Sequence, residues 1–369
     1  MKIKLVLILT FVTSLCFGQR WTEQQANDWY KKVQWPVGAN YAPAYAINQL
    51  EMWQAETFDL KAIDKEFALA ESIGMNTMRV FLHDLLYQQN ATAFLQRIDE
   101  FLAVADKHHI KILFVFFDSV WNPYPELGKQ RDPMPHVHNS GWVQSPGRKA
   151  LEDPTQYPRL EAYVKAVTKR FANDIRILGW DVWNEPDNMT GTSYERVESP
   201  RKVDLVIALL PKVFEWVRSQ KPIQPLTCGV WVLEFNGNKE LKPIEKIQLD
   251  NSDIISFHNY SDETNFEQEV AFLKKYNRPI LCTEYMARGN NSTFQGVLPV
   301  AKKHAVGAYN WGFVSGKSQT IYPWDSWEKK YVSEPPLWFH DIFRTDGTPY
   351  HQYEVDFIKN ITSTKTTGK

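Results

Sequence analysis

From residue 35 onward, short apolar runs alternate with longer amphipathic segments. The short runs are rich in Val, Ile, Phe and Trp, and each has the length of one buried β-strand. The eight runs are Trp35–Tyr41, Asn76–Leu82, Ile110–Asp118, Ile177–Trp183, Leu226–Trp231, Ile254–Tyr260, Pro279–Tyr285 and Gly307–Phe313. Strands that alternate with helices favour βαβ units, and therefore a parallel sheet.

The segments between the runs carry apolar residues at helical spacing. They predict helices over Leu60–Ile73, Ala91–His108, Tyr157–Phe171, Val203–Val217, Leu241–Leu249, Phe266–Tyr276, Phe294–Ala305 and Tyr350–Ile361. Eight strands with helices between them favour the α/β class and a single (β/α)8 barrel. A doubly wound open sheet is the alternative, but Val37–Asn40 is not the glycine-rich phosphate turn typical of that fold.

Two of the expected connections are long. Ser119–Asp153 follows the third strand and Val314–Pro336 follows the eighth. In a (β/α)8 barrel both lie on the C-terminal face, where substrates bind. Each holds two tryptophans, among them Trp121 in the first loop and Trp324 in the second. We therefore expect these loops to be walls of a binding cleft, although loops that merely cover the barrel are an alternative.

The first 18 residues have the composition of a signal peptide. Lys2 and Lys4 precede an apolar run over residues 5–15, and small residues then permit cleavage before Gln19. The run is too short to span a membrane, so we expect a secreted or periplasmic protein without a membrane span. Lipid attachment at Cys16 is the alternative, which the bulk of the preceding Leu15 disfavours.

No linker rich in Ser, Gly or Pro divides the rest of the chain. We therefore expect one domain over residues 19–361, followed by a disordered polar tail over residues 362–369. The net charge is −1 and no basic run occurs, so nothing indicates a nucleic-acid partner. The chain has 14 Trp, 16 Tyr and 21 Phe. Such rings suit a carbohydrate, because sugar rings present apolar faces flanked by hydroxyls; a Trp-rich core is the alternative.

The strongest local signals are two glutamates at strand ends. Glu185 follows the fourth run in Asn184-Glu185-Pro186, and Glu284 ends the seventh run. Burying carboxylates at such positions is costly unless they have a purpose or an ion-pair partner. A carboxyl pair across a cleft can hydrolyse a glycosidic bond, with one group protonating the leaving oxygen and the other attacking the anomeric carbon or activating water. The acid needs a raised pKa, whereas a nucleophile must stay ionised.

Other residues at strand ends fit this chemistry. Arg79 lies in an otherwise apolar strand, where it can keep a carboxylate ionised and aligned. His258 and Tyr260 are two residues apart and so share one face of a strand. Trp311 ends the eighth run and can stack on a sugar ring. A rim salt bridge and structural side chains are the alternatives.

These residues resemble the glycoside hydrolases of clan A, and most closely glycoside hydrolase family 5, the cellulase-like barrels. The resemblance covers about residues 35 to 360. Members carry an Asn-Glu acid/base pair on strand four and a nucleophilic Glu on strand seven, and they hydrolyse β-linked glycosides with retention. The family also has an Arg on strand two, a His-x-Tyr on strand six and a Trp on strand eight. The matching residues here are Arg79, Asn184, Glu185, His258, Tyr260, Glu284 and Trp311.

One position departs from the family pattern. The family often has a His at the end of strand three, where this chain has Asp118. We expect Asp118 to bind a substrate hydroxyl, or the chain to belong to a sister family. The resemblance does not select a sugar, because the family's substrates include cellulose, mannan, xylan and β-glucosides.

The sequence therefore predicts a retaining glycoside hydrolase acting on a β-linked polysaccharide or oligosaccharide. Glu185 is the expected acid/base, Glu284 the nucleophile, and Asn184 the partner of the sugar 2-hydroxyl. No metal or organic cofactor is expected. A non-catalytic carbohydrate-binding barrel is one alternative, although it should have lost a carboxylate or Arg79. A transglycosidase using the same carboxyl pair is the other.

Overall fold

The computed structural model describes residues 19–189, 191–234 and 240–363. The predicted signal peptide, including Cys16, lies outside the described residues. The eight predicted runs form one parallel sheet in the order β5-β4-β3-β2-β1-β8-β7-β6. The strands are β1 (Val37–Tyr41), β2 (Thr77–Phe81), β3 (Lys111–Asp118), β4 (Ile177–Asn184), β5 (Leu226–Thr227), β6 (Ile255–His258), β7 (Ile280–Tyr285) and β8 (Gly307–Asn310).

The two outer strands meet and close the sheet into a barrel. Just beyond β5, the backbone nitrogen of Val230 donates to the oxygen of Ser256, and the nitrogen of His258 donates to the oxygen of Val230. The fifth strand is shorter than the predicted run Leu226–Trp231, because only this bridge continues the pairing after Thr227. The single (β/α)8 barrel predicted from the sequence is confirmed.

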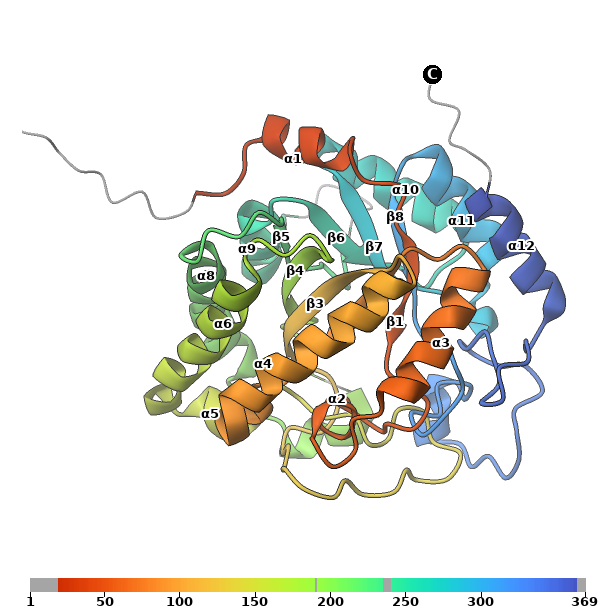
Figure 1. The fold of residues 1–369 in the computed structure, drawn as a ribbon, viewed down its shortest axis with the longest axis horizontal. Coiled ribbons are helices and arrows are strands. Elements are labelled where there is room, and N and C mark those ends of the chain that lie inside the picture. The colour runs from red at the N-terminus through yellow and green to blue at the C-terminus, as the bar shows by residue number, and fades with distance from the viewer. Residues whose placement is uncertain (1–18, 190, 235–239, 364–369) are drawn as a thin grey trace, which may run out of the picture.

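Helices surround the barrel (Figure 1). They are α1 (Glu23–Tyr30), α2 (Gln49–Trp53), α3 (Leu60–Ser72), α4 (Asp84–Lys107), α5 (Arg148–Glu152), α6 (Tyr157–Phe171), α7 (Gly191–Tyr194), α8 (Lys202–Arg218), α9 (Pro243–Asn251), α10 (Glu263–Leu273), α11 (Phe294–Lys303) and α12 (Gln352–Ser363), with 3-10 turns η1 (Pro154–Gln156), η2 (Glu195–Val197), η3 (Lys274–Tyr276), η4 (Arg288–Asn290) and η5 (Trp324–Trp327). Of the predicted tail, Thr362 and Ser363 continue α12, and residues 364–369 lie outside the described residues. The Thr362 hydroxyl bonds the backbone oxygen of Ile73, which anchors this end.

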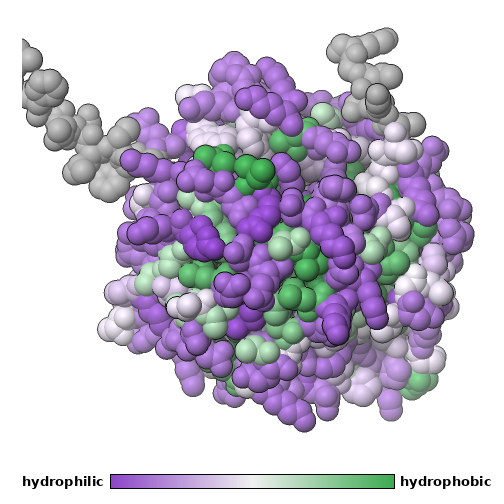
Figure 2. Space-filling view, in the orientation of Figure 1, coloured by the Kyte–Doolittle hydropathy of each residue, from purple (hydrophilic) through white to green (hydrophobic). Residues whose placement is uncertain are grey.

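Alternating strand residues and the inner faces of the helices build the core. Large buried rings such as Trp180, Phe114 and Phe116 stack between β3, β4 and their helices. The face seen in Figure 2 is largely hydrophilic, with small hydrophobic patches between the charged side chains. No helix among the described residues is long and apolar enough to cross a membrane.

The two ends of the barrel are closed differently. Helix α1 covers the N-terminal ends of the strands, where Ala26 packs with Leu113, Leu281 and Tyr309. The long loops after β3 and β8 lie at the opposite end (Figure 1). The C-terminal ends of the strands therefore open beneath these loops, which is where a barrel of this kind builds its site.

Candidate active site

The two predicted glutamates face each other across the C-terminal end of the barrel. Glu185 follows β4 and Glu284 lies in β7; they are 8% and 5% exposed. One oxygen of each carboxyl lies within 4.8 Å of the other. This spacing suits direct attack by one carboxyl, since retaining enzymes hold the two about 5–5.5 Å apart and inverting enzymes hold them ~6.5–9.5 Å apart.

Strand pairing brings the partners of these glutamates together. In the parallel register, Asn40 lies opposite Arg79, Asp118 opposite Asn184, and His258 opposite Glu284. Neighbouring strands lie about 4.8 Å apart, so side chains at such positions touch. The site is therefore a consequence of barrel register at the strand ends.

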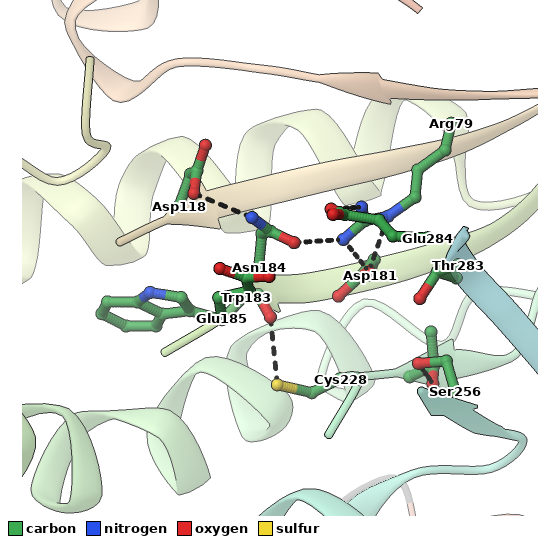
Figure 3. Close-up of polar contacts among 12 residues, drawn as sticks. Arg79, Asp118, Asp181, Trp183, Asn184, Glu185, Cys228, Ser256, Thr283 and Glu284 are labelled. Carbon is green, nitrogen blue, oxygen red and sulfur yellow. Dashed lines mark hydrogen bonds and ion pairs between the residues drawn. The ribbon is translucent and has the colours of Figure 1, made fainter. Parts of the chain in front are cut away.

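Arg79 is the central cation of the site (Figure 3). It is fully buried, and its Nη1 lies 2.9 Å from Glu284 Oε1. Its Nε and Nη2 both donate to Asp181 Oδ2, at 3.1 and 2.8 Å, and Nη2 also donates to Asn184 Oδ1 at 2.7 Å. Asn40 Oδ1 accepts from Nη1 at 2.8 Å. The planar guanidinium therefore holds both the Glu284 carboxylate and the side-chain amide of Asn184, the residue expected to bind the sugar 2-hydroxyl.

Glu284 is hydrogen-bonded at both oxygens. Besides the Arg79 contact at Oε1, the Tyr260 hydroxyl donates to Oε2 at 2.7 Å. Burial and the nearby Glu185 raise the pKa of Glu284, while Arg79 and the Tyr260 hydrogen bond lower it. These donors favour the ionised form, as a nucleophile requires.

Glu185 has a more strained backbone. Its φ of +43° places the backbone in the left-handed region, which is costly for a residue with a Cβ and recurs where a side chain must be aimed. Asn188 Nδ2 donates to its Oε2 at 2.5 Å. Burial raises the pKa of Glu185 to about 7. Glu185 is therefore able to hold a proton near neutral pH, as a general acid must.

His258 bridges the two carboxyls. Its Nδ1 lies 2.9 Å from Glu185 Oε1 and 3.5 Å from Glu284 Oε2. Burial lowers the pKa of His258 to about 4, so the ring is neutral and carries one proton. The three side chains offer ligand atoms within 4.8 Å of one another and could together hold one cation. The prediction that no metal or cofactor is needed stays a prediction.

Asp118 lies behind Asn184. Its Oδ1 accepts from Asn184 Nδ2 at 3.0 Å, and its Oδ2 accepts from the Trp142 indole at 2.6 Å. The Gln49 amide and the Val120 backbone nitrogen complete its set of donors. Burial raises the pKa of Asp118 to about 7, while Asn184 and Trp142 lower it. In this structure Asp118 contacts the side chain of Asn184 and is not among the residues that line the cleft.

A cleft of about 410 Å³ contains the two carboxyls. This volume lies in the ~300–1,000 Å³ range of small-molecule sites. The predicted site residues that line it are Trp121, Asn184, Glu185, His258, Tyr260, Glu284, Trp311 and Trp324. Arg79 and Asp118 support this lining from behind. Both long loops supply tryptophans to the wall, as expected from the sequence.

Several residues of the site were missed by the sequence analysis. Asp181 forms the buried ion pair with Arg79; it is a lone charge in an apolar strand, the same signal that singled out Arg79. Asn188 carries no such signal, since a polar residue after a strand is ordinary. The other cleft residues not predicted are Val120, His138, Asn139 and Trp231, whereas Trp142 is the second tryptophan of the loop that was expected to form a cleft wall.

Fold and cleft together define a class. A parallel eight-stranded barrel with two facing glutamates at the ends of strands four and seven, inside an aromatic-walled cleft, is the architecture of barrel glycoside hydrolases. The model of the cellulase family, glycosyl hydrolase family 5, matches residues 37–330. The chain belongs to glycosyl hydrolase family 5, as the sequence motifs indicated.

Relatives and solved structures carry names from mannan chemistry. The chain is 22% identical over 258 residues to mannan endo-1,4-β-mannosidase A of Hypocrea jecorina, a match covering 63% of this chain and 54% of that protein. It is 29% identical over 92 residues to the Emericella nidulans protein of the same name, covering 25% and 22%. The chain thus spans about half or less of these curated relatives.

Among solved structures, the fold is similar to an exo-β-1,4-mannosidase from Opitutaceae bacterium strain TAV5. The TM-score is 0.58 with 18% identity, covering 90% of this chain and 59% of that one. It is also similar to the β-mannanase of the blue mussel Mytilus edulis, with a TM-score of 0.54, 13% identity and coverage of 90% and 93%. At these identities the similarity shows the fold.

Proposed function

We propose that the protein hydrolyses β-glycosidic bonds with retention, using Glu185 as acid/base and Glu284 as nucleophile. The observation that carries this proposal is the carboxyl pair with oxygens within 4.8 Å, too close for a water to be activated between them in an inverting reaction. Family membership supports the same chemistry. The different hydrogen-bond settings of the two glutamates support the division of roles.

In the first step, a carboxylate oxygen of Glu284 attacks the anomeric carbon. The bond from that carbon to the leaving oxygen breaks, and Glu185 donates its proton to this oxygen. Arg79 and Tyr260 hold Glu284 ionised and oriented until the attack. Asn184, fixed by Arg79 and Asp118, faces the cleft, where it can bond the 2-hydroxyl as charge develops on the ring.

In the second step, Glu185 acts as a base. Its carboxylate takes a proton from a water molecule that enters from the leaving-group side, and the resulting oxygen attacks the anomeric carbon. The bond to Glu284 breaks, the sugar leaves with its original configuration, and Glu185 is protonated again. His258 lies beside both carboxyls and is neutral, so it adds no charge to the site while Glu185 loses and regains its proton.

We propose a β-mannoside-containing oligosaccharide or polysaccharide as the substrate. The names of the curated relatives and of the similar structures support this sugar. Glucose- and xylose-containing β-glycosides are the substrates to compare. A panel of 4-nitrophenyl β-glycosides with these sugars gives the preference directly as kcat/KM.

The mechanism is tested with three measurements on the purified protein. Proton NMR during hydrolysis should show the β-anomer as the first product. Glu284→Gln should lower kcat by about 10⁴-fold or more, the range seen when a nucleophilic group is removed. Glu185→Ala with azide should yield a β-glycosyl azide, because a small anion can attack without base assistance. A first product with inverted configuration, or an active Glu284→Gln, would sink the assignment.

We also propose that the chain is exported, with residues 1–18 removed. The sequence pattern of a basic start, a short apolar run and small residues before Gln19 supports this. Expression in a bacterial host followed by mass measurement of the periplasmic protein tests it. A mature chain beginning at Gln19 is expected. A chain that carries lipid at Cys16 would contradict cleavage before Gln19 and would indicate lipoprotein processing instead.

A further inference from the structure

We propose that the cleft accepts only the non-reducing end of a β-linked chain, that the enzyme therefore releases one terminal sugar at a time, and that His138 at the closed end binds a hydroxyl of that sugar. This inference rests on the proposed function and adds the mode of cleavage. Three features carry it: a bridge between two loops, an aromatic wall behind the cleft, and the positions of the two carboxyls relative to that wall.

The loops after β3 and β8 form a bridge over one side of the barrel. The backbone nitrogen of Asn139 donates to the oxygen of Ser318 at 2.8 Å, and that of His138 donates to Ser326 Oγ at 2.9 Å. The Gln319 side chain donates to the backbone oxygen of Met134 at 2.7 Å. These bonds link the two loops over the side of the barrel between β3 and β8, where a longer sugar chain would have to pass.

An aromatic wall stands beneath this bridge. The Trp142 and Trp311 rings lie 5.9 Å apart in an edge-to-face arrangement, and both pack edge-to-face on Phe81 at 5.1 and 6.0 Å. The indole nitrogen of Trp142 is fixed by its 2.6 Å hydrogen bond to Asp118. Trp142 is 3% exposed, so it does not swing freely. The wall therefore separates the cleft from strands β1 and β2.

The second loop continues the wall towards β6. The Trp324 ring lies 5.0 Å from Tyr260 and is 39% exposed, so it forms part of the rim. On the other side, Trp121 stacks on Trp327 at 5.2 Å and 18°. The rim opposite the wall is formed after β4 and β5, where Asn188 and Trp231 line the cleft and are only partly buried.

The positions of the two carboxyls determine which part of a bound substrate lies against the wall. The leaving oxygen must lie beside the acid Glu185, after β4, and the anomeric carbon beside Glu284, in β7. The leaving group therefore departs towards Asn188 and Trp231. The sugar that is transferred lies on the other side, against Trp311 and the wall.

His138 supplies a polar contact at this closed end. It lines the cleft and is 2% exposed, and its Nδ1 lies 2.8 Å from the backbone oxygen of Tyr322. That contact requires a proton on Nδ1, which leaves Nε2 of the neutral ring as an acceptor. Nε2 has no hydrogen bond with any residue that the structure describes. A hydroxyl of the terminal sugar is the donor that suits it.

The mode of cleavage is tested on the whole exported chain with β-1,4-linked manno-, gluco- and xylohexaose, each carrying a fluorophore at the reducing end. Products are measured before 10% of the substrate is consumed, and 4-nitrophenyl β-glycosides of the same sugars are run in parallel. A labelled pentaose with free monosaccharide as the first products is expected. Labelled fragments of one to three sugars at this early stage would overturn chain-end cleavage while leaving the proposed hydrolysis intact. Failure to cleave any hexaose or aryl glycoside would overturn the proposed function itself.

The role of His138 is tested with His138→Phe, which keeps a ring but removes the acceptor. KM for the preferred aryl glycoside should rise about 3- to 10-fold, the worth of one neutral hydrogen bond, with a smaller change in kcat. Tyr322→Phe is the matched control, since it removes only the hydroxyl that contacts His136 in the same bridge. Equal KM values for His138→Phe and wild type, with both proteins folded by circular dichroism, would contradict the assignment.

Discussion

At the scale of single residues, the site depends on side chains that touch other side chains as well as on those that face the cleft. Arg79 and Asp118 both contact Asn184, one at each end of its amide. With its oxygen and its nitrogen both held, the Asn184 amide has one orientation. A defined orientation matters because a misplaced contact to the 2-hydroxyl loses its effect in the transition state.

Asp118→Asn should impair catalysis through Asn184. All four partners of the Asp118 carboxylate are donors, so an amide nitrogen placed among them would face at least one donor. We expect kcat/KM to fall about 10- to 100-fold, the range for a lost hydrogen bond to a charged group. The matching 2-deoxy glycoside should show a much smaller fall, because it lacks the hydroxyl concerned.

The control for this variant is Asp253→Asn, which alters another buried carboxylate, bonded to Arg218 and far from the cleft. It should reduce stability while leaving the ratio of activities on the normal and 2-deoxy substrates unchanged. If Asp118→Asn lowered both activities equally, Asp118 would have only a structural role.

The pKa of Glu185 sets a limit on activity at alkaline pH. Burial raises this pKa to about 7, so above pH 7 the acid loses its proton. We expect kcat/KM to decline tenfold per pH unit above about pH 7 for substrates whose leaving group needs protonation. An aryl glycoside with a dinitrophenolate leaving group, which departs without a proton, should keep its activity to higher pH. Two parallel profiles would show that another group causes the decline.

At the scale of helices and strands, most of the barrel could be predicted, because burial on both faces turns parallel strands into continuous apolar runs. All eight strands were found in this way. Helices α1, α2, α5 and α7 were missed: α1 has a weakly apolar sequence and lies outside the repeating units, and the other three are helices of four or five residues within loops. Such short segments are fixed by tertiary contacts that local periodicity does not reveal.

The same distinction holds for the site. Residues at strand ends were predictable, since a charge in an apolar strand stands out and the register brings such positions together. The loop residues His138 and Asn139 were not, because their places depend on the bridge to the β8 loop more than 170 residues away. Asp118 could be located but not its partner, since the Trp142 indole that fixes it comes from the same irregular loop.

Helix α1 should contribute to stability but not to catalysis. It packs on the N-terminal ends of the strands, at the end of the barrel opposite the site, and Trp29 is partly buried there against Trp21. Trp29→Ala should remove roughly 2–3 kcal/mol, which is several degrees in Tm for a domain of this size. We expect kcat/KM to stay within twofold of wild type at 25 °C. Gln24→Ala, on the exposed face of α1, is the control and should change neither quantity.

At the scale of the whole molecule, buried ionisable groups make stability depend on pH in a particular way. Burial raises the pKa of the carboxyls of Glu66, Asp118 and Glu185 to about 7 and that of Glu269 to about 8. The native state therefore binds protons that the unfolded chain has already lost above about pH 4.3, so each group's stabilisation is lost as pH rises towards its native pKa.

Buried histidines act in the opposite direction over a lower range. Burial lowers the pKa of His138 and His258 to about 4, whereas an unfolded histidine titrates near pH 6.5. In this range the unfolded state binds more protons, so these groups favour folding more as pH rises to about 6.5. Below pH 6.5, the buried carboxyls and the buried histidines change the free energy of unfolding in opposite directions as pH rises. Above pH 6.5, only the carboxyls of these two sets still titrate. The free energy of unfolding should therefore decline from about pH 6.5 to pH 8.

Glu269 allows this decline to be isolated, because its native pKa is the highest of the set. It is 3% exposed, and Asn259 donates to its Oε2 at 2.6 Å. Between pH 6.5 and 8 its ionisation should cost the native state on the order of 2 kcal/mol. Glu269→Gln keeps the acceptor and the shape but cannot ionise, so its free energy of urea unfolding should change less with pH than that of wild type over this range.

Glu328→Gln, at an exposed position, is the control, and its free energy of unfolding should change with pH in parallel with that of wild type. If Glu269→Gln were also parallel, the loss of stability would have to come from the other buried carboxyls, and Glu66→Gln would be the variant to flatten it.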